Sequence, residues 1–410
     1  MDKENGRKKI LKVASDLIYS MAGLMVMNGV IQLVLYPYLN GRMGQERFGT
    51  MLYLLSVVAV MATTFGTSAN FSRMMAVSGR THSNGEYNIF LWIISALCLP
   101  VTFVALIARG SFSLEIFIFT SLVMIASVYR YYADVQFRMT INFKGFFIYY
   151  ALIAAGYVAG VLVYRFVDGA VPGWAVAILL GECFALIYVF FKGTILRKPF
   201  LERSKDAGTN IRSMITLSGS NFISATILNA DRILLELFVD SVAVTTFYTA
   251  SLIGKIVALL TTPLNGVIIS YISRFNKEFT RRMFGMVALA AICVGVLGTF
   301  VCTGVSYIFV SIAYPDVFEA ARPFFVLANA GQLFYFVSGS VMVVLLRFTG
   351  EKDQLYINTL YAILFAAVVI PSVILYGIRG VAVSLLLVNL GRMAIVISFG
   401  FIRLKKTGNN

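Results

Sequence analysis

Apolar stretches of at least about 18 residues recur along the whole of this 410-residue chain, and each is long enough to cross a lipid bilayer. A helix rises about 1.5 Å per residue, so about 20 apolar residues span the roughly 30 Å of hydrocarbon. Only 13% of the residues are charged, whereas about a quarter are charged in a soluble domain. We therefore expect an all-α polytopic membrane protein with no soluble domain left over.

The apolar pattern predicts twelve transmembrane helices. They run approximately over residues 17–39, 48–68, 87–108, 114–132, 146–164, 174–191, 213–239, 244–270, 284–310, 321–346, 355–376 and 381–402. The gaps around Ser111 and Gly377 are short, which leaves two interpretations open at each: a re-entrant hairpin or two separate spans.

Basic residues are distributed unevenly over the loops between these spans. Most of the 34 lysines and arginines lie in the amino-terminal segment and in the loops that follow the even-numbered spans. The opposite loops contain only Arg42, Arg47, Arg109, Arg165, Arg322 and Arg379. The positive-inside rule then predicts that both termini are cytoplasmic. The same distribution accounts for the net charge of +15, so no nucleic-acid partner is expected.

The longest polar connection separates six spans from the next six. It predicts an amino-terminal six-helix lobe over residues 1–195, a cytoplasmic linker over 196–212 and a carboxy-terminal six-helix lobe over 213–410. Transporters built from two such halves bind their substrate near the middle of the membrane, where the halves meet. We expect a central cavity between the lobes.

Polar residues form stripes at steps of three or four along the first two spans of each half, and such spacing places them on one helical face. The stripes include Asn28 and Gln32; Thr63 and Thr67; Asn221 and Asn229; and Ser251 and Thr262. Hydroxyl and amide side chains also hold transmembrane helices together, which is the ordinary explanation for any single one. Four stripes in equivalent places favour a polar cavity lining.

Charged residues inside the spans are costly unless they face water or a partner, so they are candidates for function. Arg232 can pair with Glu236 four residues later or contact a ligand. Lys255 and Arg392 have no opposite charge one turn away, and we expect them to meet an anion. Glu182 could carry a proton or pair with one of those two cations, and both interpretations stay open.

Several tyrosines near the predicted span ends allow two interpretations. They could stack on sugar rings, but aromatic side chains at these positions more commonly form a belt at the membrane interface. The residues concerned are Tyr129, Tyr131, Tyr132, Tyr149 and Tyr150.

Motifs for covalent chemistry are absent from the sequence. It contains no G-x-x-x-x-G-K-[ST] phosphate loop, no H-E-x-x-H, no G-x-S-x-G and no paired-cysteine metal pattern. The outer loops are too short for an extracytoplasmic catalytic site. We therefore expect a transporter or flippase rather than an enzyme, with no cofactor and no metal site.

Two segments resemble a known family. The stretch Tyr36-Pro-Tyr-Leu-Asn-Gly-Arg-Met-Gly-Gln-Glu-Arg-Phe-Gly-Thr-Met-Leu-Tyr is similar to the opening of polysaccharide flippases, a short glycine-rich loop followed by F-G-x-x-x-Y. Asn229-Ala-Asp-Arg-Ile-Leu-Leu-Glu-Leu-Phe, followed by Thr246-Phe-Tyr-Thr-Ala-Ser, resembles their D-R-x-x-L-G … Y-x-x-A passage. Glu236 stands where that family often has glycine, so the family does not support an Arg232–Glu236 pair.

The resemblance implies the Wzx-like, O-antigen and capsule-type branch of the multidrug/oligosaccharidyl-lipid/polysaccharide exporter superfamily, with a MATE-like fold. Such proteins flip undecaprenyl-pyrophosphate-linked oligosaccharides across the bacterial cytoplasmic (inner) membrane by alternating access between two lobes. The expected partners are this lipid-linked substrate, the lipid bilayer and other polysaccharide assembly proteins. The anion contacts would be Lys255, Arg392 and Arg232.

Two other functions stay open. A cation-coupled multidrug exporter of the same fold would need acidic residues at mid-membrane, where Glu182 and Asp231 are the candidates for proton or sodium coupling. A membrane-embedded glycan polymerase is the third alternative, and the short outer loops argue against it.

Overall fold

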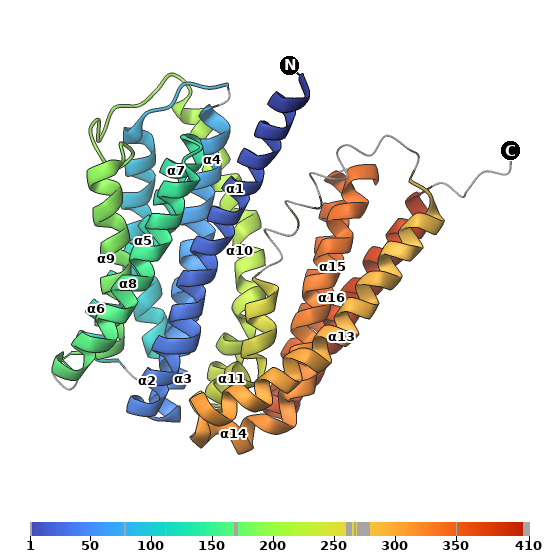
Figure 1. The fold of residues 1–410 in the computed structure, drawn as a ribbon. Coiled ribbons are helices and arrows are strands. Elements are labelled where there is room, and N and C mark those ends of the chain that lie inside the picture. The colour runs from blue at the N-terminus through green and yellow to red at the C-terminus, as the bar shows by residue number, and fades with distance from the viewer. Residues whose placement is uncertain are drawn as a thin grey trace, which may run out of the picture. The chain divides into compact units, whose positions relative to one another are not determined.

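The computed structural model describes residues 2–77, 79–110, 112–167, 171–259, 265, 268, 279–349 and 351–404. Every regular element in these ranges is a helix, as Figure 1 shows. The predicted all-α fold is confirmed. Contacts within the chain define two compact units: unit 1 comprises Met1–Gly44 and Thr50–Ile233, and unit 2 comprises Gln45–Gly49 and Leu234–Asn410. The predicted lobe boundary at residues 196–212 and the predicted cavity between lobes stay predictions.

The helices of unit 1 follow the predicted spans closely, and two of the spans contain a short π-helical segment. The elements are α1 (Asp2–Val30), the π-helix η1 (Ile31–Leu35), α2 (Tyr36–Met43), the greater part of α3 (Gln45–Met61), the π-helix η2 (Ala62–Gly66), α4 (Thr67–Val77), α5 (Asn84–Ala108), α6 (Leu114–Ala133), α7 (Val135–Met139), α8 (Phe143–Val167), α9 (Gly173–Lys192) and most of α10 (Ala207–Phe238).

Unit 2 contains the start of α3, the end of α10 and the helices that follow. These are α11 (Ser241–Ala258), α13 (Arg281–Ala313), α14 (Pro315–Ala321), the short 3-10 helix η3 (Arg322–Phe324), α15 (Phe325–Thr349) and α16 (Glu351–Arg403).

Ten helical stretches of the described residues are long and apolar enough to cross a membrane. The difference from the twelve predicted spans has two sources. The last stretch, Tyr356–Arg403, contains both final predicted spans. The predicted span 213–239 coincides, up to Phe238, with part of α10, which is not among the ten stretches. As far as the structure describes them, the predicted spans thus each have a helix at their place, and the chain is a multi-pass membrane protein.

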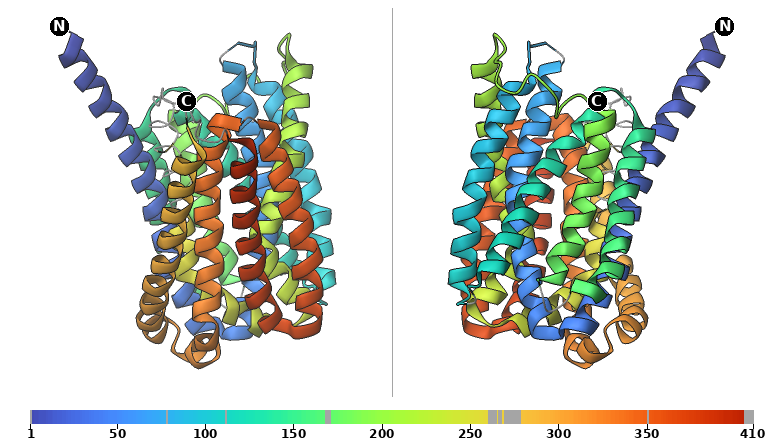
Figure 2. Two further views of the ribbon diagram at one scale, coloured as in Figure 1. Left: turned by 90° about the vertical axis from the view of Figure 1, so that its right-hand side faces the viewer. Right: turned by 90° about the vertical axis from the view of Figure 1, so that its left-hand side faces the viewer.

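The helix α16 is two antiparallel helices joined at Gly377, where the backbone leaves the helical region at φ 56° and ψ −135°. A side chain at Gly380 would lie 1.9 Å from the Ser372 carbonyl oxygen, so the turn is closely packed. Farther along, the Tyr361 hydroxyl donates to Asn389 Oδ1 at 2.9 Å. The left view of Figure 2 shows the two halves side by side. Each half is long enough to cross a bilayer, which favours separate spans over a re-entrant hairpin.

The loops after even-numbered spans meet at one end of each unit. In unit 1 the Thr81 amide donates to Asp206 at 2.8 Å, and the Thr194 amide donates to Gln136 at 2.9 Å. In unit 2 Arg403 lies 2.9 Å from Asp353. Within each unit, the loops that the basic residues assign to the same side of the membrane therefore lie at the same end. Which side of the membrane these ends face stays a prediction.

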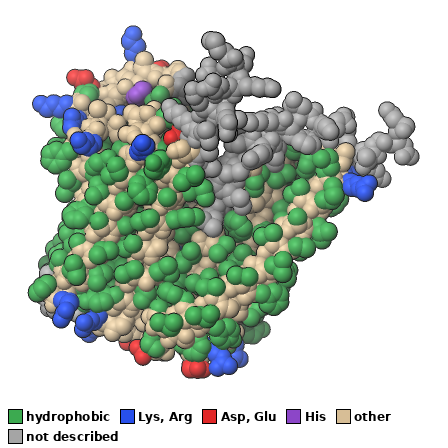
Figure 3. Space-filling model, viewed as in Figure 1, with side chains coloured by type: hydrophobic (Ala, Val, Ile, Leu, Met, Phe, Trp, Pro, Cys, Tyr) green, Lys and Arg blue, Asp and Glu red, His purple; other side chains and the backbone are tan. Residues whose placement is uncertain are grey.

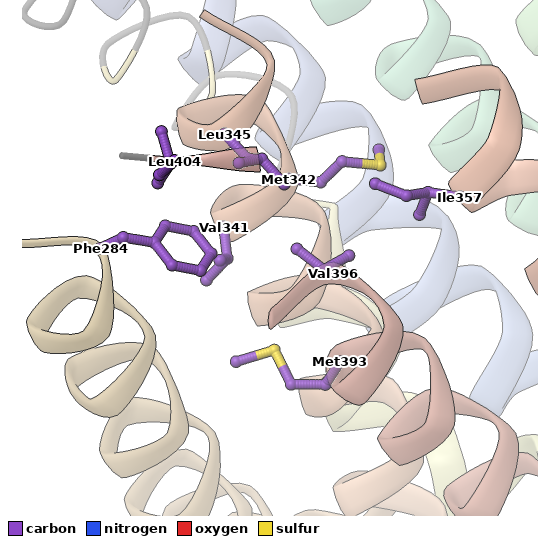
Figure 4. Close-up of a cluster of buried hydrophobic side chains, with 8 residues drawn as sticks. All are labelled: Phe284, Val341, Met342, Leu345, Ile357, Met393, Val396 and Leu404. Carbon is purple, nitrogen blue, oxygen red and sulfur yellow. The ribbon is translucent and has the colours of Figure 1, made fainter. Parts of the chain in front are cut away.

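Apolar side chains cover the helices outside and inside. On the face drawn in Figure 3, hydrophobic side chains line the lengths of the helices, and Lys and Arg gather near the helix ends. Inside unit 2 a buried cluster joins α13, α15 and α16, as Figure 4 shows. Its members are Phe284, Val341, Met342, Leu345, Ile357, Met393, Val396 and Leu404. This cluster fixes the helix that carries Arg392.

Candidate functional site

A buried ion pair lies inside unit 1. Arg130 Nε of α6 is 2.6 Å from Glu182 Oε2 of α9, and the two side chains are 9% and 2% exposed. Ser127, one turn before Arg130, donates its hydroxyl to Glu182 Oε1 at 3.2 Å. The Arg130 guanidinium also lies 4.2 Å from the centre of the Tyr131 ring. Glu182 therefore has a cationic partner, but neither Lys255 nor Arg392, the two that the sequence left open.

Close helix packing holds Glu182 in place. Gly156 and Gly160 of α8 lie four residues apart and face Gly181 and Ala177 of α9, which are also four residues apart. A Cβ on Gly156 would come within 2.6 Å of Gly181 Cα, and one on Gly160 within 2.6 Å of Ala177 Cα. Small residues at this spacing let transmembrane helices approach closely. The approach places Glu182, next to Gly181, in the buried interior.

A second buried carboxylate, Asp134, lies where α6 meets α7. It accepts hydrogen bonds from the Tyr150 hydroxyl at 2.9 Å, from Arg138 at 3.0 Å and from the Asn70 side-chain amide. The Tyr149 hydroxyl donates to the Arg130 carbonyl oxygen at 2.8 Å. These four donors bond to Asp134 and to the Arg130 carbonyl oxygen, and they connect α4, α7 and α8 to the end of α6.

These contacts decide between sugar stacking and an interfacial belt for three of the five tyrosines. Tyr132, Tyr149 and Tyr150 are buried, and their hydroxyls bond to Arg73, Arg130 and Asp134. A belt at the lipid interface is therefore the wrong interpretation for these three. Their rings are packed inside unit 1, which also leaves them no free face for a sugar.

The polar stripes of the first two spans pass through the two π-helical segments. Gln32 lies in η1, and its side-chain oxygen is buried without a hydrogen-bond partner among the described residues. Thr63 lies in η2, and Thr67 follows directly after it. Asn28, one turn before Gln32, donates to the Leu24 carbonyl oxygen at 2.8 Å. Short π-helical turns are rare and are frequently found at functional sites, which favours these segments as part of one.

The stripe on α10 is partly engaged within unit 1. Asn221 donates to the Ser68 hydroxyl at 2.8 Å, so it joins α10 to α4. Asn229 accepts from Arg232 at 2.8 Å, and Arg232 Nε lies 3.8 Å from Asp231 Oδ1. Asp231 is buried, and Arg232 is half-buried. The pairing of Arg232 with Glu236 stays a prediction.

Unit 2 brings the other two predicted cations to helices that pack on α15. Lys255 of α11 follows Gly254, whose amide donates to Asn329 Oδ1 of α15 at 2.8 Å. The Lys255 ammonium lies 5.5 Å from the centre of the Tyr248 ring, and Ser251 is buried between these two positions. Thr262, predicted on the same stripe, lies outside the described residues.

Arg392 lies in the second half of α16 and is 6% exposed. Its guanidinium carbon is 4.5 Å from the centre of the Tyr335 ring and 5.0 Å from that of Tyr361. Among the described residues it has no carboxylate within ion-pair distance. A buried guanidinium without a carboxylate can receive an anion.

The structure thus divides the predicted residues between the units. Unit 1 contains Asn28, Gln32, Thr63, Thr67, Glu182, Asn221, Asn229, Asp231 and Arg232, whereas unit 2 contains Ser251, Lys255 and Arg392. Their roles stay predictions. Sequence reasoning missed Arg130, because it counted this residue, near the end of the predicted span 114–132, with the basic residues of the following loop. No cluster of His, Cys, Asp and Glu suited to a metal ion occurs among the described residues.

No family model and no curated protein matches the sequence. Solved structures do match. An inward-facing multidrug resistance MATE family transporter of the MOP superfamily gives a TM-score of 0.61 over 96% of this chain and 97% of its own, at 12% identity. The lipid II flippase MurJ, in an inward closed conformation, gives 0.67 over 93% and 87%, at 13% identity.

The chain has the fold of the MATE transporters and MurJ. A MATE protein in a straight conformation agrees, with a TM-score of 0.60 over 96% of this chain and 95% of its own, at 13% identity. The predicted MATE-like fold class is confirmed. Because the identities are this low, the likeness concerns the fold, and the cargo must be argued from the side chains.

Proposed function

We propose that this protein flips an anionic, lipid-linked oligosaccharide across a bacterial cytoplasmic membrane by alternating access, for the synthesis of a surface polysaccharide of O-antigen or capsule type. The substrate would be an oligosaccharide joined through pyrophosphate to undecaprenol. The fold is shared with MurJ, a lipid II flippase, and that likeness supports a flippase of the same superfamily.

The observation that carries the proposal is the balance of buried charge. Inside unit 1, Glu182 is paired with Arg130, Asp134 with Arg138, and Asp231 lies near Arg232. Arg73, also buried in unit 1, lacks a carboxylate but donates to the Tyr132 and Asn84 side chains. In unit 2, by contrast, Arg392 has neither a carboxylate nor a side-chain acceptor among the described residues. A basic group buried in a membrane is expensive unless it meets water or a partner. An anionic substrate would supply that charge.

A cation-coupled multidrug exporter is the second candidate, and the MATE likeness favours it. Such a protein would use buried carboxylates to bind a cationic drug or the coupling ion. Here the Glu182 carboxylate is already held by Arg130 and Ser127. The charge balance therefore supports the flippase over the drug exporter. A proton or sodium gradient remains open as the driving force.

Deletion of the gene, followed by analysis of surface glycan and lipid-linked intermediates, tests the proposal. A flippase mutant loses the polysaccharide and accumulates the undecaprenyl-pyrophosphate-linked oligosaccharide. Normal surface glycan with increased sensitivity to cationic drugs would support the exporter instead. Loss of glycan with only single repeat units transferred to the acceptor would indicate a polymerase.

A further inference from the structure

Two tyrosine rings, whose centres are 6.2 Å apart, pack against Arg392 in unit 2, and we call these three side chains the bracket. Tyr335 comes from α15 and Tyr361 from the first half of α16, and their ring centres lie 4.5 Å and 5.0 Å from the guanidinium carbon. Aromatic faces attract a guanidinium and stabilise its charge. Tyr361 is buried, whereas Tyr335 keeps part of its surface exposed. A ligand can therefore approach the bracket from the side of Tyr335.

The hydrogen-bonding capacity of Arg392 is mostly unused. A guanidinium has five N–H donors, and the hydrogen bond that Arg392 makes runs from a terminal nitrogen to the Tyr335 carbonyl oxygen, at a long 3.4 Å. Its Nε is buried without any partner among the described residues. The other two buried arginines of the described residues have partners: Arg130 pairs with Glu182, and Arg73 donates to the Tyr132 hydroxyl and to Asn84 Oδ1. The remaining donors of Arg392 require an acceptor that the described residues do not supply.

Hydrogen bonds to neighbouring helices fix the bracket. The Tyr361 hydroxyl donates to Asn389 Oδ1, and the Asn389 amide donates to the Gly331 carbonyl oxygen of α15, both at 2.9 Å. The Ser338 hydroxyl donates to the Tyr335 carbonyl oxygen at 3.0 Å. The rings and the guanidinium are thus held before any ligand arrives, which lowers the entropy lost on binding.

The chemistry of the bracket selects a phosphoryl group. Rings beside a guanidinium leave the N–H groups at its edge available, and these match two oxygens of a phosphate or pyrophosphate. A lysine could supply the charge but not this paired geometry.

The depth of Arg392 distinguishes a lipid in transit from an ordinary bilayer lipid. Arg403 and Asp353 pair at the end of unit 2 where α15 is followed by α16. Arg392 lies eleven residues before Arg403 on the same helix, which corresponds to about 16 Å. Since the hydrocarbon core is about 30 Å thick, this is near mid-membrane. The headgroup phosphates of resting phospholipids lie at the surface.

We propose that Arg392, Tyr335 and Tyr361 form a subsite for the pyrophosphate of the lipid-linked substrate at a mid-membrane stage of its passage. The inference rests on the proposed function and adds the site and the chemical group that it binds. Glycan specificity would then depend on other residues, because the bracket contacts only the group that all such substrates share.

Binding of undecaprenyl pyrophosphate without any sugar tests the subsite. The purified protein in nanodiscs would be titrated with this lipid and, in a parallel arm, with phosphatidylglycerol. The variants are Arg392→Ala, Arg392→Lys and Tyr335→Leu. Arg403→Ala, which removes an exposed arginine of the same helix, is the matched control. Thermal unfolding of each variant establishes first that it is folded.

We expect Arg392→Ala to weaken undecaprenyl pyrophosphate binding at least tenfold and Arg392→Lys several-fold, with Arg403→Ala close to wild type. Arg392→Lys keeps the charge and carries the test if the alanine variant does not fold. Unchanged binding in folded Arg392 variants would overturn the subsite. Equal loss of phosphatidylglycerol binding would also overturn it, because the site would then belong to ordinary phospholipids. If undecaprenyl pyrophosphate binding depends on Arg392 but the protein does not transport the lipid-linked oligosaccharide, the subsite is supported and the proposed function is refuted.

Discussion

Arg130 and Glu182 form an ion pair inside unit 1, with Arg130 Nε and Glu182 Oε2 only 2.6 Å apart and both side chains at least nine-tenths buried. Each charge alone would be costly away from water, so each depends on the other. The pair explains why a carboxylate persists in the middle of the predicted span 174–191. It also removes Glu182 from the set of carboxylates that could bind a cationic drug.

Breaking this pair on one side should destabilise the protein strongly. We expect Glu182→Leu alone to cost about 3–5 kcal/mol, because it leaves the Arg130 guanidinium buried and unpaired. The double variant Arg130→Met, Glu182→Leu should recover most of that loss. Thermal unfolding in detergent would measure both. Glu319→Leu is the control, since the Glu319–Arg322 pair is exposed and such pairs contribute about 0–1 kcal/mol. Equal stability of the single and double variants would show that the pair does not matter.

The contact between α8 and α9 should be sensitive to one added methyl group. Gly156→Ala would place a Cβ 2.6 Å from Gly181 Cα, and backbone atoms cannot easily move away. Overpacking of this kind costs about 1–3 kcal/mol. Gly304→Ala is the matched control, because nothing lies within 4 Å of the added atom. The Tm of purified protein should fall for the first variant only; an equal Tm for both would contradict the close approach.

The loop contact between Thr81 and Asp206 should depend on pH. The Thr81 amide and hydroxyl donate to the Asp206 carboxylate at 2.8 and 2.9 Å, and they lower its pKa below the usual value. A lowered folded pKa stabilises the contact above about pH 4, the ordinary aspartate pKa, and that stabilisation is lost as the pH falls through the folded pKa. Hydrogen exchange of residues 79–86 should be faster in Asp206→Asn than in wild type at pH 7. The two proteins should converge as the pH falls below the folded pKa of Asp206, and a constant difference would argue against this linkage.

Lys255 should be required for function rather than for folding. If it contacts the anionic substrate, Lys255→Ala removes a charge-assisted contact of about 1.5–3 kcal/mol, which corresponds to at least about a tenfold loss. We expect surface polysaccharide to fall towards the deletion level while the amount of protein stays constant. Lys192→Ala, at the exposed end of α9, is the control. Normal polysaccharide at normal expression of Lys255→Ala would rule out this role.

The spans were predictable because uninterrupted apolar length is written directly in the sequence. The ends of the spans were harder to predict, and the misplacement of Arg130 shows the consequence. The predicted span stopped at residue 132, whereas the helical stretch continues through α7 to Met139, with a local break at Asp134. Arg130 lies inside both, but so close to the predicted end that it was counted with the basic residues of the following loop.

Partners across helices could not be predicted from one sequence. Nothing local to Glu182 indicates that α9 lies against α6, so Arg130 was not a candidate partner. The burial of Tyr149 and Tyr150 has the same cause, because a tyrosine near a span end looks alike whether it faces lipid or a neighbouring helix. The π-helical segments depend on backbone hydrogen bonding, which the residue pattern around Gln32 and Thr63 does not reveal.

Transport in proteoliposomes tests the central claim most directly. The purified protein would be reconstituted with a fluorescent undecaprenyl-pyrophosphate-linked oligosaccharide, and the fraction that reaches the opposite leaflet would be measured over time. We predict translocation by the wild type and at least a tenfold slower rate for Arg392→Ala. Export of a cationic dye under a proton or sodium gradient, with no movement of the lipid-linked oligosaccharide, would contradict the account.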